Sequence, residues 1–162
     1  MRVNLGAGDQ YAEGWVNVDH EDCPYPRDET VDLTGTLPWA ERSLTHVYAG
    51  HVLEHLDLAD CRRLLVRLRA CMAPAGELMV VGPDLDRAAA LALGPWDLMG
   101  LRLGARRWPG DEHQWDCTSA TVVDLLVEAG WTDVVDVPVV DVPPPWPIAY
   151  RPAWQCAVSA RP

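Results

Sequence analysis

The sequence predicts an α/β fold in which a doubly wound, mostly parallel sheet ends in an antiparallel hairpin at its C-terminal edge. The first observation is that short apolar strands alternate with helical periodicity, which is typical of a parallel sheet covered on both faces. The second is that several strands end in glycine, histidine or aspartate, as at the ligand-binding edge of such sheets. The third is composition. Hydrophobic residues make up 49% of the 162 positions, so we expect one domain over residues 1–162.

The first half of the chain predicts four strands and one clear helix. Each expected strand is a short run of strand-forming residues followed by turn residues. These runs lie at residues 3–5, 16–18, 30–33 and 45–49. The helix is expected at residues 58–72, with Asp57 as its N-cap. Its buried face is predicted from helical spacing: Cys61, Leu64, Leu65, Leu68, Cys71 and Met72.

The second half predicts a central strand, a second capped helix and the edge hairpin. The central strand is expected at residues 77–81, and Thr118 or Ser119 caps a helix that ends at Gly130. The extended run 134–142 and the terminal strand 154–159 are expected to pair antiparallel. Residues 85–117, with one Ala/Leu helix, and the proline-rich residues 143–152 are expected to be loops on the substrate side of the sheet.

Composition excludes several classes of protein. The net charge of −11 argues against nucleic acid, whose binding depends on neutralising phosphates. No apolar run approaches the roughly 18 residues that span a bilayer, and no signal core opens the chain, so we expect a cytoplasmic protein without a membrane partner. The five cysteines form no CxxC pair, which favours buried reduced thiols. The basic residues are all arginine, as in a GC-rich bacterial source.

The most informative stretch is a Gly-x-Gly turn followed by an acidic strand end. Gly6 and Gly8 follow the first strand, and Asp19 ends the second strand eleven residues after Gly8. Glycines let the backbone approach a ligand closely, and an aspartate at this place can accept hydrogen bonds from ribose hydroxyls. A dinucleotide fingerprint would need a third glycine at Tyr11 and an acid about 20 residues on. The spacing therefore favours S-adenosylmethionine over NAD or FAD.

An ordered series of motifs extends this pattern along almost the whole chain. The series is Asn4-Leu-Gly-Ala-Gly8, Gly14-Trp-Val-Asn-Val-Asp19, Val31-Asp-Leu33, Gly50-His-Val-Leu-Glu-His-Leu56, Ala73-Pro-Ala-Gly-Glu77, Val81-Gly-Pro-Asp84, His113-Gln-Trp115 and Glu128-Ala-Gly-Trp131. In this order the motifs resemble the class I S-adenosylmethionine-dependent methyltransferases, and most closely their short, type 11-like branch. The resemblance implies a Rossmann-like fold and S-adenosylmethionine as cofactor.

The resemblance also implies a role for each matching residue. Gly6, Ala7 and Gly8 would wrap the methionine portion of the cofactor, and Asp19 would hold the ribose hydroxyls. His20 would flank the adenine, whose amino group Asp32 would bind beside the Leu33 backbone. The implied cofactor-binding set is Asn4, Leu5, Gly6, Ala7, Gly8, Asp19, His20, Asp32, Leu33 and His51.

The chain departs from the family pattern in two ways. Asn4 stands where the family has an acidic residue, and Gln10 stands where it has a third glycine. The helices that often precede the first strand and cap the substrate are reduced to a minimal N-terminal cap. We therefore expect an open site, a site completed in a homodimer, or a site built for a large acceptor.

The implied reaction is methyl transfer to an oxygen or nitrogen of a sugar, glycan or small natural product. A hydroxyl acceptor needs a base, and the candidates are His51, His55, Asp84 and His113. We favour His51 first, because it follows a strand end, and His113 second. Trp96, Trp108 and Trp115 are candidates either to stack on the acceptor or to pack over the core.

Three alternatives stay open. The first is a non-catalytic binding or scaffold protein of the same fold. The second is a zinc hydrolase, because residues 51–55 match H-x-x-E-H, which would place His51 and His55 on one helical face with Glu54 as base. The third is methyl transfer assisted by a metal on His51, His55 or Asp84. We assign no metal ligands from the sequence.

Overall fold

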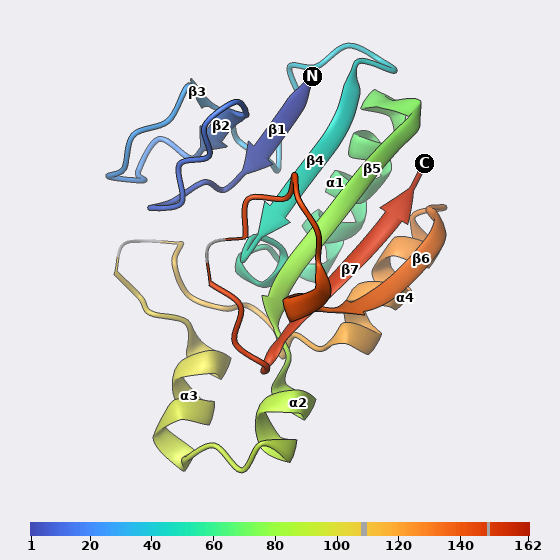
Figure 1. The fold of residues 1–162 in the computed structure, drawn as a ribbon. Coiled ribbons are helices and arrows are strands. Elements are labelled where there is room, and N and C mark those ends of the chain that lie inside the picture. Colours follow the sequence, from blue (N-terminus) through green and yellow to red (C-terminus); the bar gives the residue numbers. More distant parts are fainter. Residues whose placement is uncertain (108–109, 149) are drawn as a thin grey trace.

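The computed structural model describes residues 1–107, 110–148 and 150–162, which form one seven-stranded sheet with helices (Figure 1). The strands lie in the order β3-β2-β1-β4-β5-β7-β6. Their bounds are β1 Arg2–Leu5, β2 Val16–Asp19, β3 Glu29–Thr30, β4 Leu44–Gly50, β5 Met72–Pro83, β6 Thr132–Pro138 and β7 Gln155–Arg161. The α-helices are α1 Leu58–Cys71, α2 Leu85–Ala90, α3 Pro95–Leu103 and α4 Ser119–Glu128, and two 3₁₀ turns are η1 Leu53–His55 and η2 Val139–Asp141.

The pairing of the strands confirms the predicted fold class. β1 pairs in parallel with β2 and β4, β2 with β3, and β4 with β5. β7 runs antiparallel to both β5 and β6, which makes the expected C-terminal hairpin. The chain moves outward from β1 to β3 and then returns to place β4 on the other side of β1. The carboxyl ends of β1 and β4 therefore form a topological switch point, where α/β sheets bind ligands.

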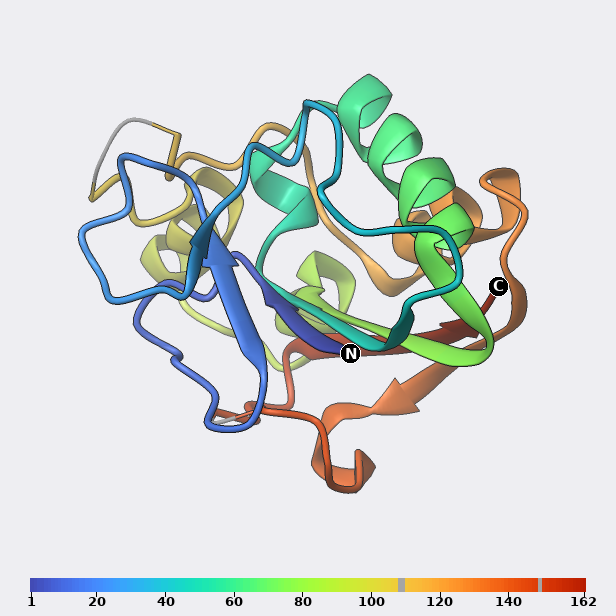
Figure 2. The same ribbon diagram turned by 90° about the horizontal axis from the view of Figure 1, so that it is seen from above.

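One face of the sheet is covered by α1 and α4 (Figure 2). The side chain of Asp57 accepts a hydrogen bond from the backbone N–H of Asp60 at 2.7 Å, so Asp57 is the N-cap predicted for α1. The predicted apolar face of α1 is buried in the main core together with Val47 and Leu78 of the sheet. Trp131 follows α4 and joins the two helices, because its indole N–H donates to the carbonyl of Leu65 at 3.1 Å.

The opposite face is covered by irregular segments among the described residues. Tyr48 and Met79 point to this face and pack with Trp15 and Trp146, which come from the β1–β2 connection and the segment after η2. Figure 2 shows η2 and its loop on the side of the sheet away from α1 and α4. Arg151 ties this segment together by donating to the carbonyls of Val139 and Val142. Both faces are covered as predicted, although only one is covered by helices.

The structure corrects several predicted element bounds. β3 ends at Thr30 instead of residue 33, because the Asp32 side chain accepts from the backbone N–H and hydroxyl of Thr34 and closes a turn. β5 is longer than predicted, since Met72 already pairs with Leu44. The run 134–142 divides into β6 and η2, and the segment 85–117 contains two helices instead of one.

Two further expectations concern the whole chain. All five cysteines are free and buried, in agreement with the predicted reduced thiols. In the described part of the chain, no helix has the length and apolar character that a membrane crossing needs.

Candidate functional site

A cavity of about 570 Å³ opens at the carboxyl ends of β1, β2 and β4. Every cofactor-binding residue predicted from the sequence lines it except Leu5: Asn4, Gly6, Ala7, Gly8, Asp19, His20, Asp32, Leu33 and His51. Leu5 is fully buried in the main core and supports the cavity from beneath. The cavity lies at the switch point between β1 and β4. The predicted residues therefore line the place where sheets of this kind bind ligands.

The glycine turn lines the cavity with backbone. Gly6 and Gly8 have φ values of +56° and +51°, a left-handed conformation that side-chain-bearing residues rarely adopt. A Cβ atom on Gly6 would lie 2.6 Å from Cγ2 of Val52, so a side chain does not fit there. The turn is held from below, because the N–H of Ala7 donates to the carbonyl of Val18 at 3.1 Å. The result is a rigid loop whose backbone faces the cavity.

Asp19 is fixed in its orientation by two backbone groups. Its Oδ2 accepts from the N–H of Gly8 at 2.7 Å, and its Oδ1 accepts from the N–H of His20 at 2.7 Å. A carboxylate has about four acceptor sites, so each oxygen can accept one further hydrogen bond. Since Asp19 lines the cavity, these remaining sites suit the hydroxyls of a bound ligand.

Asn4 and Gln10, the two departures from the family pattern, contact each other. The amide of Asn4 donates to the carbonyl of Gln10 and to Oδ1 of Asn17, both at 3.0 Å. Asn4 and Asn17 are both buried, and Asn17 in turn donates to Asp28 through its backbone N–H at 2.7 Å. This bond, followed by those from Tyr11 and the Asn17 side chain, lowers the pKa of Asp28. Asn4 therefore anchors the glycine turn to β2.

A second acidic turn, formed by Asp32, Leu33 and Thr34, also lines the cavity. Oδ1 of Asp32 accepts from the hydroxyl and backbone N–H of Thr34 at 2.7 and 2.8 Å, and these bonds lower the pKa of Asp32. Arg67 of α1 reaches this turn and donates to the carbonyls of Leu33 and Thr34 at 3.0 Å each. Arg67 is a residue that the sequence analysis missed, since helical periodicity alone places it on the exposed face.

His51 sits between two polar side chains at the end of β4. Its φ of +56° is unusual for a residue with a side chain and turns the ring toward the cavity. Nδ1 lies 2.9 Å from Oε1 of Glu54, and Nε2 lies 2.6 Å from Nε2 of Gln155. The arrangement fits a neutral imidazole that donates from Nδ1 to Glu54 and accepts at Nε2 from the Gln155 amide.

Glu54 is a carboxylate in the interior, 1% exposed. Burial acts to raise its pKa, but the hydrogen bond and charge of His51, with the charge of His55, outweigh burial and hold the pKa below its usual value. Glu54 is therefore ionised near neutral pH. The H-x-x-E-H motif predicts Glu54 only as the base of a hydrolase, whereas in the structure Glu54 accepts a hydrogen bond from His51.

The second predicted base, His113, lies outside the cavity lining. Its Nδ1 is 2.7 Å from the carbonyl of Leu101, and its ring packs against His55 with centroids 4.8 Å apart. His55 does line the cavity. The structure thus brings the two histidines together but offers only His55 to a ligand in the cavity.

Asp84 is a helix cap instead of a base or metal ligand. Its Oδ1 accepts from the N–H groups of Asp86 and Arg87 at the start of α2, and its Oδ2 accepts from the N–H of Ser119 at the start of α4. The side chain is buried. These bonds, which no single helical pattern shows, explain why an acidic residue follows the buried strand β5.

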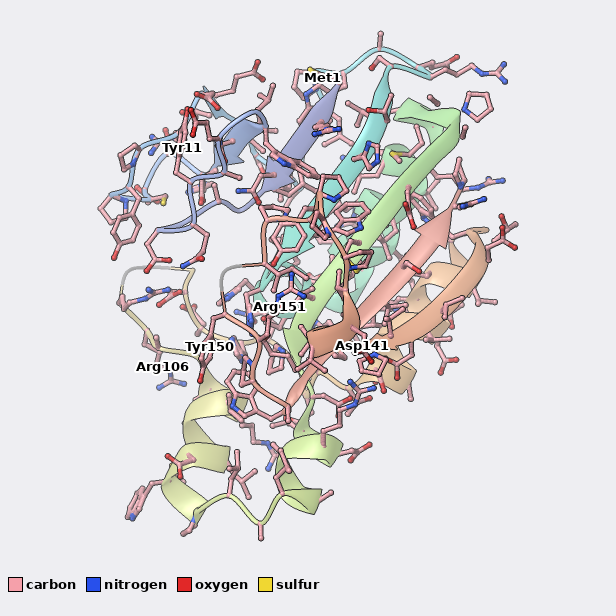
Figure 3. The ribbon with its side chains drawn as sticks, in the orientation of Figure 1. Met1, Tyr11, Arg106, Asp141, Tyr150 and Arg151 are labelled. Atoms are coloured by element: carbon pink, nitrogen blue, oxygen red, sulfur yellow. The ribbon has the colours of Figure 1, made fainter. Side chains whose placement is uncertain are left out.

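Trp96 and Trp115, the two described tryptophans among those considered for the acceptor pocket, do not line the cavity. Trp115 packs on η1, and its indole N–H donates to the carbonyls of Leu53 and Leu56. Trp96 on α3 is 80% exposed. Trp108 lies outside the described residues. The aromatic residues of the lining are instead Tyr48 and Tyr150, and Figure 3 labels Tyr150 on the segment between η2 and β7.

The zinc-hydrolase interpretation is wrong about local structure. It needs His51 and His55 one turn apart on an α-helix, whereas the helical part of this motif is the short 3₁₀ turn η1. His51 precedes η1 with a positive φ and binds Glu54 instead of sharing a face with His55.

Comparison with known proteins finds similarity in fold but none in sequence families. No model of a protein family matches the chain, and no curated protein matches its sequence. Among solved structures, a SAM-dependent methyltransferase from Archaeoglobus fulgidus matches with a TM-score of 0.67 and 16% identity, over 99% of this chain and 85% of that one.

Two longer enzymes also superpose over 99% of this chain. Human N-acetylserotonin methyltransferase, in complex with SAM, matches with a TM-score of 0.60, 18% identity and 46% of its own length. The riboflavin-derivative dimethyltransferase RosA from Streptomyces davawensis matches with a TM-score of 0.62, 20% identity and 48% of its length. The chain thus spans about half of these two proteins. Together with the strand order, these matches show that the chain has the class I S-adenosylmethionine-dependent methyltransferase fold.

Proposed function

We propose that the protein transfers a methyl group from S-adenosylmethionine to an oxygen or nitrogen of a sugar, glycan or small natural product. The observation that carries the proposal is the corner formed by Gly8 and Asp19 in the cavity at the switch point. It joins a side-chain-free turn, which admits the amino-acid portion of a ligand, to a carboxylate whose free acceptor sites suit a ribose.

The rest of the cavity fits the same cofactor. Gly6, Ala7 and Gly8 line the cavity, so the turn offers its backbone to the cofactor. Beyond Asp19, His20 and Leu33 line the region for an adenine, with Asp32 beside it. Asp9, Asp19 and Asp32 place negative charge around the cavity, which favours a positively charged sulfonium ligand. These residues compensate for the charge that Asn4 does not supply.

His51 is the proposed general base. When bound, the cofactor supplies an already activated methyl group, so the protein has mainly to position the acceptor and exclude water. Because Glu54 accepts a hydrogen bond from Nδ1 of His51, the proton of the neutral ring is on Nδ1. The lone pair of Nε2 is then directed to Gln155 and the cavity. A hydroxyl acceptor that displaces the Gln155 amide can give its proton to Nε2. Glu54 then stabilises the imidazolium that forms.

The size and charge of the site support a small acceptor. A cavity of about 570 Å³ falls within the range of small-molecule sites, roughly 300–1,000 Å³, and S-adenosylmethionine would fill a large part of it. The names of the human enzyme and RosA specify N-acetylserotonin and a riboflavin derivative, which are small molecules. The net charge of −11 supports the exclusion of nucleic acid.

Two further proposals concern the setting of the reaction. Five free, buried cysteines suit a reducing compartment, which supports action in the cytoplasm. The outer face of α3 supports a homodimer, because Trp96 and Met99 on this helix are exposed. Sedimentation equilibrium of the purified chain tests the dimer: a single species with the monomer mass of 17.9 kDa would contradict it.

The test of the main proposal is methyl transfer by the wild type, His51→Gln and a control, His46→Gln. Each is incubated with methyl-labelled S-adenosylmethionine and a panel of free sugars, aryl glycosides, phenols and amines. We expect transfer by the wild type and the control. In His51→Gln we expect transfer to hydroxyl acceptors to fall by about 10² to 10⁴, while S-adenosylhomocysteine still binds. Failure of the wild type to bind either cofactor form would contradict the proposal.

The contact between His51 and Gln155 also favours a second candidate, a non-catalytic binding protein. The Gln155 amide occupies Nε2 at 2.6 Å, so in this arrangement the base has no free lone pair. A wild type that binds S-adenosylhomocysteine but transfers no methyl group to any acceptor of the panel would support this second candidate over the enzyme. Regained transfer in Gln155→Ala would instead show that the amide is a removable block.

A further inference from the structure

We propose that Glu54, His55 and His113 bind one divalent transition-metal ion at the acceptor end of the cavity. One ligand atom from each residue lies within 4.8 Å of those of the other two. Glu54 and His55 come from η1, and His113 comes from the loop before α4, so the fold assembles a set that no local motif contains. The role proposed for the metal rests on the proposed methyl transfer, whereas its binding does not.

The two histidines are oriented as metal ligands are. Nδ1 of His55 lies 3.3 Å from the carbonyl of Glu112, and Nδ1 of His113 lies 2.7 Å from the carbonyl of Leu101. A carbonyl only accepts, so each Nδ1 carries the proton and each Nε2 keeps its lone pair. Metal-binding histidines typically donate their other ring N–H to a carbonyl or carboxylate in this way.

Glu54 supplies a carboxylate with remaining capacity for a cation. Its Oε1 lies 2.9 Å from Nδ1 of His51, and a carboxylate has about four acceptor sites. A carboxylate that is 1% exposed is costly unless positive charge compensates it. A cation bound between Glu54, His55 and His113 provides such compensation, beside the contact with His51.

The ligand types select the class of metal. Two imidazoles and one carboxylate suit Zn²⁺, Mn²⁺, Fe²⁺ or Co²⁺, whereas Mg²⁺ and Ca²⁺ prefer oxygen ligands alone. Three ligands spaced evenly about 2.1 Å from one tetrahedral ion lie roughly 3.4 Å apart. The three ligand atoms lie within 4.8 Å of one another, so they have to approach by up to about 1.4 Å.

The position of the ion indicates its role in the proposed methyl transfer. Three protein ligands leave at least one coordination position open, as in catalytic metal sites. Of the three ligands only His55 lines the cavity, so we infer that an acceptor reaches the ion from the side of His55. An ion here binds an acceptor oxygen and lowers the pKa of its hydroxyl, which makes an oxygen acceptor the favoured substrate class. This set replaces the sequence-based alternative, because Asp84 caps α2 and α4 and His51 binds Glu54.

The test is calorimetric titration of the full chain, freed of metal with EDTA, with ZnCl₂ and with MnCl₂. We expect one site per chain for at least one of the two ions. His55→Gln, His113→Gln and Glu54→Gln should each weaken binding by tenfold or more, and His46→Gln, at a histidine outside the cluster, should bind as the wild type does. No stoichiometric binding by the wild type, or equal binding by the three cluster variants, would overturn the proposal.

A measurement without substitutions covers the case in which a variant does not fold. Co²⁺ bound to the wild-type protein should show the ligand-field absorption and paramagnetically shifted ring protons of two imidazole ligands. A Co²⁺ complex without shifted imidazole protons would overturn the site. Titration of the same metal-free protein with S-adenosylhomocysteine separates the two proposals. Cofactor binding without metal binding rejects only the metal site, and metal binding without cofactor binding rejects only the methyltransferase.

Discussion

The backbone N–H of Gly8 donates to Oδ2 of Asp19 at 2.7 Å, so the turn after β1 and the acidic end of β2 form one unit. The parallel register explains the contact, because Val3 pairs with Val16 and Leu5 with Val18. Residues that follow Leu5 and Val18 must therefore meet at the same edge of the sheet. This corner forms part of the cavity wall and fixes the position of the Asp19 carboxylate in it.

Replacing Gly6 should damage this corner more than replacing another left-handed glycine. Gly6→Ala adds a Cβ 2.6 Å from Val52, whereas Gly14, with a φ of +79°, has no neighbour within 4 Å. We expect Gly14→Ala to cost about 1–2 kcal/mol from backbone strain alone. Gly6→Ala should cost about 1–3 kcal/mol more from overpacking and should weaken S-adenosylhomocysteine binding. Urea unfolding and calorimetry measure the two effects, and equal stability of the two variants would contradict the account.

Replacing Asp84 should lower stability without acting on the chemistry directly. Asp84→Ala removes the N-cap of α2 and leaves the half-buried N–H of Ser119 without its acceptor. Loss of a cap and of a buried hydrogen-bond partner predicts a decrease of about 2 kcal/mol or more in the free energy of unfolding. Asp86→Ala, at an exposed position of α2, is the control and should change stability by less than about 0.5 kcal/mol. Unchanged unfolding of Asp84→Ala would refute a capping role.

His46 should make stability depend on pH between about 5 and 7. Burial, followed by the charge of Arg2, lowers the pKa of His46, which packs against Trp15 and Trp146 and whose Nδ1 has no hydrogen-bond partner in the described structure. The unfolded chain, with a histidine pKa near 6.5, therefore binds a proton at a pH where the folded chain does not. Stability falls as pH decreases through this window.

Thermal unfolding of the wild type and His46→Gln at several pH values checks this dependence. The decrease in Tm from pH 7 to pH 5 should be smaller in His46→Gln, because one titrating histidine is gone. It should not vanish, because burial also lowers the pKa of His113. Carboxylates with lowered pKa, such as Asp28, lose their contribution only at more acidic pH. Parallel Tm curves for the two proteins would show that His46 makes no contribution.

The fold and much of the cavity lining could be predicted from the sequence, because both follow from local pattern. Short strands that end in Gly6 or Asp19 define one sheet edge once the sheet is parallel, and the periodicity after Asp57 defines α1. The motif predicts Leu5 as part of the site, whereas its side chain is buried in the main core.

The acceptor side could not be predicted, because it depends on contacts between distant segments. Gln155 reaches His51 only because β7 inserts beside β5, and His113 reaches His55 only through the path of the loop before α4. In the sequence, an acidic residue at the end of a strand, such as Asp84, can be either a base or a helix cap. Only its three hydrogen bonds from backbone N–H groups identify Asp84 as a cap. Arg67 belongs to an exposed helical face by periodicity, yet it holds the turn at Leu33.

The most direct test of the central claim is calorimetric titration of the metal-free chain with S-adenosylhomocysteine, for the wild type, Asp19→Asn and Asp22→Asn. The account predicts micromolar binding by the wild type and by Asp22→Asn, whose carboxylate lies outside the cavity lining. Asp19→Asn should bind at least tenfold more weakly, about 1.4 kcal/mol, as expected for lost hydrogen bonds to a charged group. Equal dissociation constants for the three proteins, or no binding by the wild type, would contradict the assignment of this cavity to a nucleoside cofactor.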